Sequence, residues 1–267
     1  MTAIAVTIAG SDPSGGAGIQ ADLKTFSALG VYGASVVTAL TAQNTRGVQG
    51  IHDVPPEFVA LEIDSVFSDL SVDAVKIGML SRPAVIEAVA AGLDRHGAEK
   101  VVLDPVMVAA SGDPLLVPEA VETLRRALLP KALLVTPNLP EAAALLGEDT
   151  AQTDAAVMGQ AERILALGPR AVLIKGGHAD GAESVDVLLD QEGFTRFASP
   201  RIETRNTHGT GCTLSSAIAA GLARGLPLRE ATAEAKTYIA AAIAASDRLR
   251  IGHGHGPVHH FHGVWTA

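Results

Sequence analysis

The sequence predicts an α/β protein of three layers, in which helices cover both faces of a largely parallel central sheet. Short uninterrupted apolar runs alternate with stretches of helical periodicity, which is typical of buried parallel strands joined by helices. Aromatic residues are only 3% of the chain, so alanine, valine, leucine and isoleucine must build the core. The 27 glycines and 14 prolines mark many turns between short elements. No polar linker or repeat divides the 267 residues, and we expect one domain, residues 1–267.

The first two thirds of the chain contain the expected parallel strands. A strand at residues 4–9 leads through a glycine-rich turn into a helix at 18–29, which Gly30 closes. Residues 34–40 are the next strand-like run, and residues 55–70 have the apolar spacing of a helix. Further strands, each separated from the next by a helical pattern, are predicted at residues 74–78, 101–103, 133–135 and 171–174.

The last third of the chain changes character. Residues 184–189 and 194–198 flank the turn pair Glu192-Gly193, which predicts an antiparallel hairpin near the edge of the sheet. Two helices are predicted after it, at residues 212–223 and 228–249.

Charge and composition exclude several classes of function. The formal net charge is −9 and no basic stripe is visible, which argues against a binder of nucleic acid or of anionic membranes. Cys212 is the single cysteine, so the chain forms no disulfide with itself. The N-terminus lacks the pattern of a signal peptide, and no apolar run approaches the ~20 residues of a membrane span. We therefore expect a cytoplasmic protein.

The first glycine-rich segment, residues 10–18, lies between a strand and a helix. It is not a P-loop, because no Lys-Ser or Lys-Thr follows the glycines. Residues 16–21 fit a loose dinucleotide fingerprint, but they begin about six residues past the strand. No acidic residue lies near Val36, where a ribose-binding acid would be expected. A lone match of this kind is weak evidence, and a tight turn with a glycine at the start of a helix is the favoured interpretation.

A second segment, residues 207–213, leads directly into an apolar helix. Its two glycines allow backbone amides to converge, and the positive end of the helix dipole adds to them. This pattern predicts an anion hole suited to a phosphoryl group, with the Cys212 thiol shifted toward thiolate. A structural helix start with a small buried cysteine is the alternative.

Two further segments place polar groups after predicted strands. Asn138 and Glu141 open a helix, where they either form a capping box or hold the water shell of a Mg²⁺ ion. The residues alone favour the cap. Lys175, followed by Gly176-Gly177-His178, suits a phosphate contact, although a lysine at a strand end is more often simply solvated.

The ends of the predicted strands bring these groups together. Asp104 directly follows the strand at 101–103, Asn138 follows the next strand, and Lys175 ends the one after it. In open α/β sheets, ligands bind beyond the carboxyl ends of the strands. We therefore expect these side chains and the 207–213 segment to line one rim of the sheet.

Taken together, these motifs resemble the hydroxymethylpyrimidine/phosphomethylpyrimidine kinases of the ribokinase-like superfamily. The resemblance covers almost the whole chain in order. Its motifs are AGSDPSGGAGIQADLKT (9–25), TALTAQNT (38–45), VKIGML (75–80), LDPVMVAASGDPLL (103–116), TPNLPEAAALL (136–146), IKGGH (174–178), NTHGTGCTLSSA (206–217) and GHGHGPVHHF (252–261).

The resemblance implies a ribokinase-like α/β/α sandwich that transfers the γ-phosphoryl group of ATP, with Mg²⁺, to a small pyrimidine alcohol and then to its monophosphate. Many sugar kinases of the superfamily have an aspartate where Cys212 stands, so Cys212 is a base, a member of the anion hole, or both. The implied catalytic residues are Gly209, Thr210, Gly211, Cys212 and Lys175. Those implied at the nucleotide are Asp104, Thr136, Asn138, Glu141, Lys175 and Thr207.

On the substrate side the resemblance points to Gln43, whose amide can read an aminopyrimidine edge. Gly10, Ala17, Asp22, Met79 and Val106 match positions that line the family's pocket. Met79 and Val106 fit a core equally well, and Asp22 fits a helix-start acid. A homodimer is common among relatives. A pyridoxal-type kinase and a non-catalytic vitamin sensor are the alternatives, although a sensor need not keep Lys175 and Cys212.

The C-terminus is rich in histidine, at positions 253, 255, 259, 260 and 262. Such a cluster is able to bind zinc or nickel. No carboxylate or thiol accompanies it to complete a metal cage, so packing is the favoured interpretation.

Overall fold

The central sheet carries the site on its carboxyl edge. In this computed structural model, which describes residues 2–107, 118–176 and 181–265, eight strands form the sheet in the order β10-β9-β8-β7-β6-β5-β1-β2. Their bounds are β1 Ile4–Ala9, β2 Tyr32–Val37, β5 Ala74–Ile77, β6 Val101–Leu103, β7 Leu134–Val135, β8 Val172–Lys175, β9 Glu183–Asp190 and β10 Gly193–Pro200. Pairing is parallel from β2 to β8 and antiparallel through β9 and β10.

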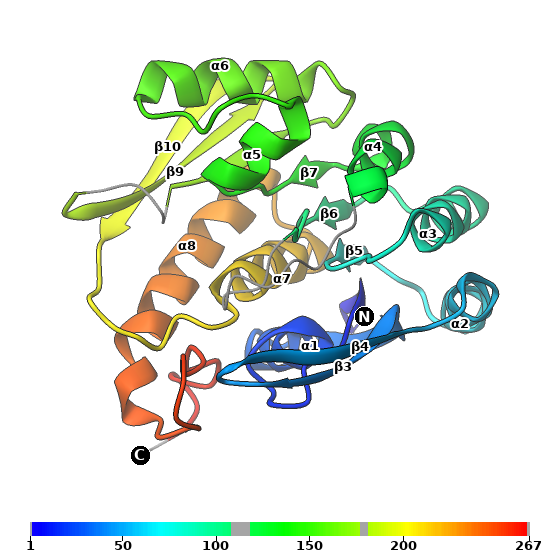
Figure 1. Ribbon diagram of the computed structural model, residues 1–267, viewed down its shortest axis with the longest axis horizontal. Helices are drawn as coiled ribbons and strands as arrows, with labels where there is room; N and C mark the ends of the chain where they lie inside the picture. The colour runs from blue at the N-terminus through cyan, green and yellow to red at the C-terminus, as the bar shows by residue number, and fades with distance from the viewer. Residues whose placement is uncertain (1, 108–117, 177–180, 266–267) are drawn as a thin grey trace.

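Helices cover both faces of this sheet (Figure 1). On one face are α1 (Gly18–Ala28), α7 (Thr210–Ala223) and α8 (Leu228–Ala244), and on the other α2 (Pro56–Asp69), α3 (Pro83–His96), α4 (Pro118–Ala127), α5 (Leu139–Leu146) and α6 (Asp154–Leu165). Each set buries its own apolar cluster against the strands. The predicted three-layer architecture, with its antiparallel edge hairpin, is confirmed.

A second, smaller sheet was not predicted. Residues 34–40 do not form one strand: β2 ends at Val37, and the chain leaves the central sheet at Thr38. The Thr38 amide donates to the Ala9 carbonyl (3.0 Å), and its hydroxyl donates to the Met79 carbonyl (2.9 Å). The chain then forms an antiparallel hairpin, β3 (Ala39–Asn44) and β4 (Gly47–Asp53), which carries polar and exposed side chains.

The C-terminal segment returns to this hairpin. The predicted helix at 228–249 stops at Ala244 and a short 3-10 helix follows at Ser246–Arg248, after which the chain runs beside the β3–β4 turn (Figure 1). The amide of His255 donates to the Thr45 carbonyl at 2.8 Å. The tail therefore joins the hairpin to the main body. No helix within the described residues is long and apolar enough to cross a membrane.

Candidate active site

A cavity of about 780 Å³ opens at the carboxyl edge of the sheet, where the strand order predicts a ligand site. Most of the predicted site residues line it: Gly10, Ala17, Gln43, Met79, Asp104, Val106, Asn138, Glu141, Lys175, Thr207, Gly209, Thr210, Gly211 and Cys212. The predicted convergence on one rim is confirmed. His178 and residues 108–116 of the LDPVMVAASGDPLL motif lie outside the described residues.

The N-terminus of α7 presents backbone amides to the cavity. Gly209 caps the helix with φ +81°, and a Cβ there would lie 1.8 Å from the carbonyl oxygen of Gly16, so only glycine fits. The first helical hydrogen bond runs from the Thr213 amide to the Gly209 carbonyl (2.9 Å). The amides of Gly211 and Cys212 find no acceptor in the described part of the chain. Such amides at the positive end of a helix form an anion site.

Lys175, at the end of β8, supplies a cation beside these amides. Its Nζ lies 2.7 Å from Asp104 Oδ1, to which the Thr136 hydroxyl also donates (3.0 Å). A Cβ at Gly211 would lie 3.3 Å from Nζ, so the absence of a side chain there makes room for the ammonium group. Burial lowers the pKa of Lys175, but the charges of Asp104 and Glu141 outweigh it and raise that pKa. The lysine is therefore charged at neutral pH.

Asp104 is ionised as well. Burial opposes ionisation of this carboxyl, but the nearby charges of Lys175 and Lys76 together with two hydrogen bonds hold its pKa below the usual range. The buried pair thus consists of two full charges, and Lys175 keeps one side toward the cavity.

Asn138 and Glu141 form the predicted capping box of α5. The Glu141 amide donates to Asn138 Oδ1 (2.8 Å), and the Asn138 amide donates to Glu141 Oε2 (2.7 Å). Oε2 also lies 3.7 Å from Lys175 Nζ, and burial raises the pKa of this carboxyl. Glu141 Oε1 has no partner within the described ranges and belongs to a cavity-lining residue.

The oxygen ligands near Lys175 determine which metal ion this site fits. No group of three or more His, Cys, Asp or Glu side chains able to hold a metal occurs among residues 2–107, 118–176 and 181–265. A single carboxylate beside bound phosphates nevertheless fits Mg²⁺, which keeps several of its waters and takes few protein ligands. Glu141 is thus compatible with a Mg²⁺ ion that arrives with a nucleotide.

The folded site shifts the pKa of Cys212 in the direction opposite to the one predicted from the helix dipole. Burial raises the pKa of its thiol to about 11, and the charge of Lys76 only partly opposes this effect. The thiol belongs to the lining of the cavity, at the third residue of α7. The desolvation of a small side chain inside a folded site outweighs the dipole of the helix start.

Gln43 projects from the small sheet at an irregular point of its pairing, where the register shifts between Ala42 and Gln43. Its Oε1 accepts from the Thr41 hydroxyl (3.3 Å), whereas its Nε2 has no partner among the residues described. Met79 closes the same end: its Cε would lie 2.7 Å from a Cβ at Gly10. This end is a small, mostly apolar pocket with one free amide donor.

Two of the predicted site residues do not line the cavity. Thr136 is buried and supports Asp104, and Asp22 is buried beneath the cavity, bonded to Lys76. Their positions are those of supporting side chains rather than of ligand contacts.

The sequence interpretation missed a hub formed by Asp12 and His208. Asp12 Oδ2 accepts from the amides of Gly16 (3.1 Å) and Ala17 (2.8 Å) and lies 2.8 Å from His208 Nε2. Burial opposes its ionisation, but His208 and the other donors lower the pKa of Asp12 to about 2. The hub joins the glycine-rich segment to the residue before Gly209. The Asp-Pro-Ser sequence, typical of a side-chain-stabilised turn, was the available signal.

The sequence interpretation also missed the far end of the cavity, away from Gln43. Its apolar lining comes from α8, from the end of β10 and from the segment after it, and includes Pro200, Ile202, Ile239, Ala240 and Ile243. Lys236 Nζ lies 2.7 Å from Asp186 Oδ2, and Asp186 Oδ1 accepts from the Gly176 amide (3.0 Å). An ion pair thus fixes the chain just after Lys175.

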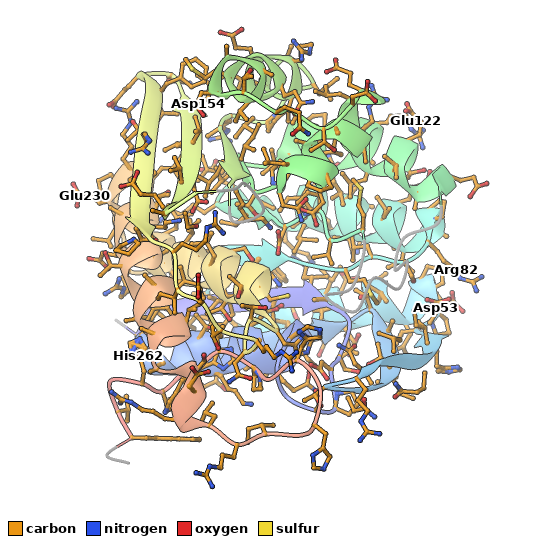
Figure 2. All side chains as sticks on the ribbon, turned by 60° about the vertical axis from the view of Figure 1, so that its left-hand side comes forward. Asp53, Arg82, Glu122, Asp154, Glu230 and His262 are labelled. Carbon is orange, nitrogen blue, oxygen red and sulfur yellow. The ribbon has the colours of Figure 1, made fainter. Side chains whose placement is uncertain are left out.

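The C-terminal histidines pack against α7 and α8. His260 is buried, with its Nε2 3.0 Å from the Thr213 hydroxyl, and its carbonyl accepts from the Tyr238 hydroxyl (2.6 Å). Burial lowers the pKa of His260 to about 3, so this ring is neutral. The His262 ring is tilted against Tyr238 with ring centroids 5.2 Å apart, and Figure 2 shows this histidine beside α8. These contacts agree with the packing interpretation.

The chain is similar to known proteins over its full length. The family model "Phosphomethylpyrimidine kinase" matches residues 12–259. The hydroxymethylpyrimidine/phosphomethylpyrimidine kinase of Rhizobium meliloti is 62% identical over 99% of both chains. The "Thiamine biosynthesis bifunctional protein ThiED" of Geobacter sulfurreducens is 56% identical over 96% of this chain and 51% of its own length.

Among solved structures, an ADP complex of Bacillus subtilis pyridoxal kinase superposes with a TM-score of 0.90 at 39% identity, covering 97% of this chain and 98% of that one. This similarity confirms the predicted ribokinase-like fold. Together with the match over residues 12–259, it leads to one conclusion: the chain belongs to the phosphomethylpyrimidine kinase family.

Proposed function

We propose that this kinase transfers the γ-phosphoryl group of ATP to 4-amino-5-hydroxymethyl-2-methylpyrimidine and then to its monophosphate, a step of thiamine biosynthesis. The observation that carries the proposal is the placement of one cation and two free amides in the cavity. Lys175 and the amides of Gly211 and Cys212 meet there, and the small Gln43 pocket and the apolar far end open into the same cavity. Phosphoryl transfer depends chiefly on such positioning and charge stabilisation.

The nucleotide is proposed to occupy the far end. The apolar side chains of Ile239 and Ile243 suit a base, and Thr207 and Asn138 line the way toward the amides of α7. Asp104 and Thr136 act behind Lys175, because both bond within the buried pair that orients it. In this arrangement the γ-phosphoryl group lies at the amides and beside Lys175.

The acceptor alcohol is proposed to occupy the Gln43 end. The free Nε2 of Gln43 is able to donate to a ring nitrogen, and its Oε1 is able to accept from a 4-amino group. Ala17, Met79 and Val106 supply the apolar contacts to the ring. Gly10 leaves room for the Met79 methyl group that closes this pocket.

Mg²⁺ is proposed to bind with the nucleotide phosphates, through a water held by Glu141 and, less directly, Asn138. Bound there, the ion would neutralise phosphate charge that builds up during transfer. Cys212 faces the alcohol as an anion-hole member and, in its ionised form, as the acceptor of the alcohol proton.

The proposal is tested by incubating the protein with ATP, Mg²⁺ and one of three acceptors: hydroxymethylpyrimidine, its monophosphate, or pyridoxal. We expect ADP release and a phosphorylated product with the first two. Turnover of pyridoxal alone would replace the proposal with the vitamin kinase suggested by the Bacillus subtilis structure. Binding of the pyrimidine without turnover would indicate a sensor.

The wider setting is proposed as follows. Residues 1–267 act as one kinase domain, in the cytoplasm and without nucleic acid partners. A homodimer is supported by large apolar side chains exposed on the small sheet and on α2, namely Leu40, Ile51, Phe58 and Leu61. Light scattering of the purified protein would measure its mass and decide the oligomeric state.

A further inference from the structure

A fully buried ion pair lies at the cavity, which one of its members, Lys76, helps to line. Lys76, in the middle of the apolar strand β5, and Asp22, on α1, are both fully buried. Lys76 Nζ lies 2.9 Å from Asp22 Oδ1 and 2.8 Å from Oδ2. An isolated buried charge is very costly, so each partner requires the other.

The carboxylate of this pair is fully bonded. The Thr7 hydroxyl donates to Asp22 Oδ2 (2.6 Å) and the Ser216 hydroxyl to Oδ1 (2.7 Å), so Asp22 joins β1, β5, α1 and α7. The ammonium group is different. Within the described residues, both hydrogen bonds of the Lys76 ammonium group go to the Asp22 carboxylate, so its third N–H has no acceptor there. Lys76 also belongs to the lining of the cavity.

The pair is bonded to α7 one turn after Cys212, through the Ser216 hydroxyl. Ser216 follows Cys212 by four residues on α7, so the two side chains share one face of the helix. The charged groups around the thiol are the cations Lys76 and Lys175 and the carboxylates Asp22 and Asp104. Of these, Lys76 exerts the largest charge effect on the thiol, and its effect favours ionisation.

We propose that Lys76 is the positioning residue that stabilises the thiolate form of Cys212, and that Asp22 holds Lys76 in place rather than contacting substrate. This proposal rests on the proposed function in one respect only, the fate of the alcohol proton. The alcohol oxygen forms a bond to the γ-phosphorus, and the bond from that phosphorus to the β–γ bridging oxygen breaks. ADP leaves with the electron pair, and the proton passes to the Cys212 thiolate.

The test alkylates Cys212, the single thiol of the chain, with iodoacetamide across pH 7–11 in the absence of substrate. The informative variant is Lys76→Met/Asp22→Asn, which removes both charges together. We expect it to be alkylated about threefold more slowly at a given pH. A rise of about one unit in the pKa of the thiol leaves tenfold less thiolate, which the greater nucleophilicity of a more basic thiolate offsets in part.

Two further variants separate electrostatics from packing. Asp22→Asn alone keeps the cation, and its alkylation should equal or exceed the wild-type rate. Lys131→Met/Asp94→Asn removes a surface pair of the same residue types and should change nothing. Circular dichroism checks the fold of each protein. If Lys76→Met/Asp22→Asn does not fold, Lys76→Gln/Asp22→Asn, which keeps a polar pair at the same place without either charge, is used instead, and the same slowing is expected.

Turnover provides the second measurement. We expect Lys76→Met/Asp22→Asn to lower kcat about tenfold and to leave KM for the alcohol within about twofold, because Lys76 acts through Cys212. Alkylation at the wild-type rate, or equal slowing in this variant and in Asp22→Asn, would overturn the proposal. Because alkylation needs no substrate, a wrong substrate assignment would leave this readout intact.

Discussion

Two buried lysine–aspartate pairs flank the start of α7, and they differ in what they face. The Lys76–Asp22 pair is sealed, with both side chains 0% exposed, and its carboxylate is bonded to hydroxyls of β1 and α7. The Lys175–Asp104 pair keeps 12% of its lysine side chain exposed, toward the cavity and beside the free amides of α7. The same chemical pair is therefore fully buried on one side of the helix start and partly exposed on the other.

The difference shows what decides the role of a buried charge. Attraction within each pair raises the pKa of its lysine, so both lysines are charged. Among the described residues, Lys175 has a second carboxylate, Glu141, 3.7 Å away and Lys76 has no second ion-pair partner, and Lys175 and Asp104 lie at the ends of strands. Solvent exposure, rather than charge, separates the lysine that we propose touches phosphate from the one that we propose supports the thiol.

Lys175→Met should have the largest effect on activity. It removes the cavity-facing cation, and loss of one donor to developing charge costs about 10²–10³ in kcat. Steady-state kinetics with hydroxymethylpyrimidine and ATP would measure this. A loss below about tenfold would contradict the distinction between the two pairs, and Lys131→Met, at a half-buried lysine outside the cavity, is the control.

Cys212→Ser should lower kcat by about 10², the lower end of the range for a proton acceptor. Burial keeps the thiol mostly protonated, and loose phosphoryl transfer requires little from a base. The same kinetics, with KM for ATP as an internal check, would measure this. An unchanged kcat would leave Cys212 as lining only and would remove the reason for a supporting Lys76.

Gln43→Ala changes a part of the cavity away from both lysine–aspartate pairs. Its effect on binding is a reference with which the effects of changing the pairs are compared. Losing a paired hydrogen bond in a pocket costs about 1–3 kcal/mol, so we expect the pyrimidine to bind roughly 30-fold more weakly. ATP affinity should be unchanged. Calorimetry with each ligand measures both values, and equal weakening of the two would place Gln43 outside the acceptor end.

Glu141→Gln examines the second carboxylate near Lys175. Glutamine also serves in a capping box, so the helix start should remain intact while the negative charge is lost. We expect the Mg²⁺ concentration for half-maximal activity to rise about tenfold. Thr153→Ala, which removes the side-chain cap of α6 away from the cavity and lowers the unfolding free energy by about 1 kcal/mol, is the matched control.

The smallest effect concerns stability at alkaline pH. A lysine whose pKa is raised on folding stabilises the protein fully below its unfolded pKa, and that contribution is lost as the pH rises through the folded pKa. By pH 11.5, Lys76 should account for about 1 kcal/mol of the decrease in unfolding free energy. Urea unfolding at pH 9 and 11.5 should show a shallower decrease for Lys76→Met/Asp22→Asn than for the wild-type protein.

Much of the framework could be predicted because its signals are local. The strands at 4–9 and 101–103 were predicted with their observed bounds, since an apolar run and its flanking turns lie within a few residues. The capping box of Asn138 and Glu141 is likewise set by residues three apart. The rim of Asp104, Asn138 and Lys175 followed from one rule, that parallel strands end at the same edge.

The tertiary structure decided the features that depend on distant residues. The β3–β4 hairpin takes its place from contacts of Thr38 with Ala9 and Met79, which a polar local sequence does not reveal. Lys76 and Asp22 lie 54 residues apart, so their pairing is not visible in the sequence, although a lysine inside an apolar strand signals a buried charge. The ionisation of Cys212 follows from burial and surrounding charges, because desolvation depends on the whole folded site and not on the helix that carries the thiol.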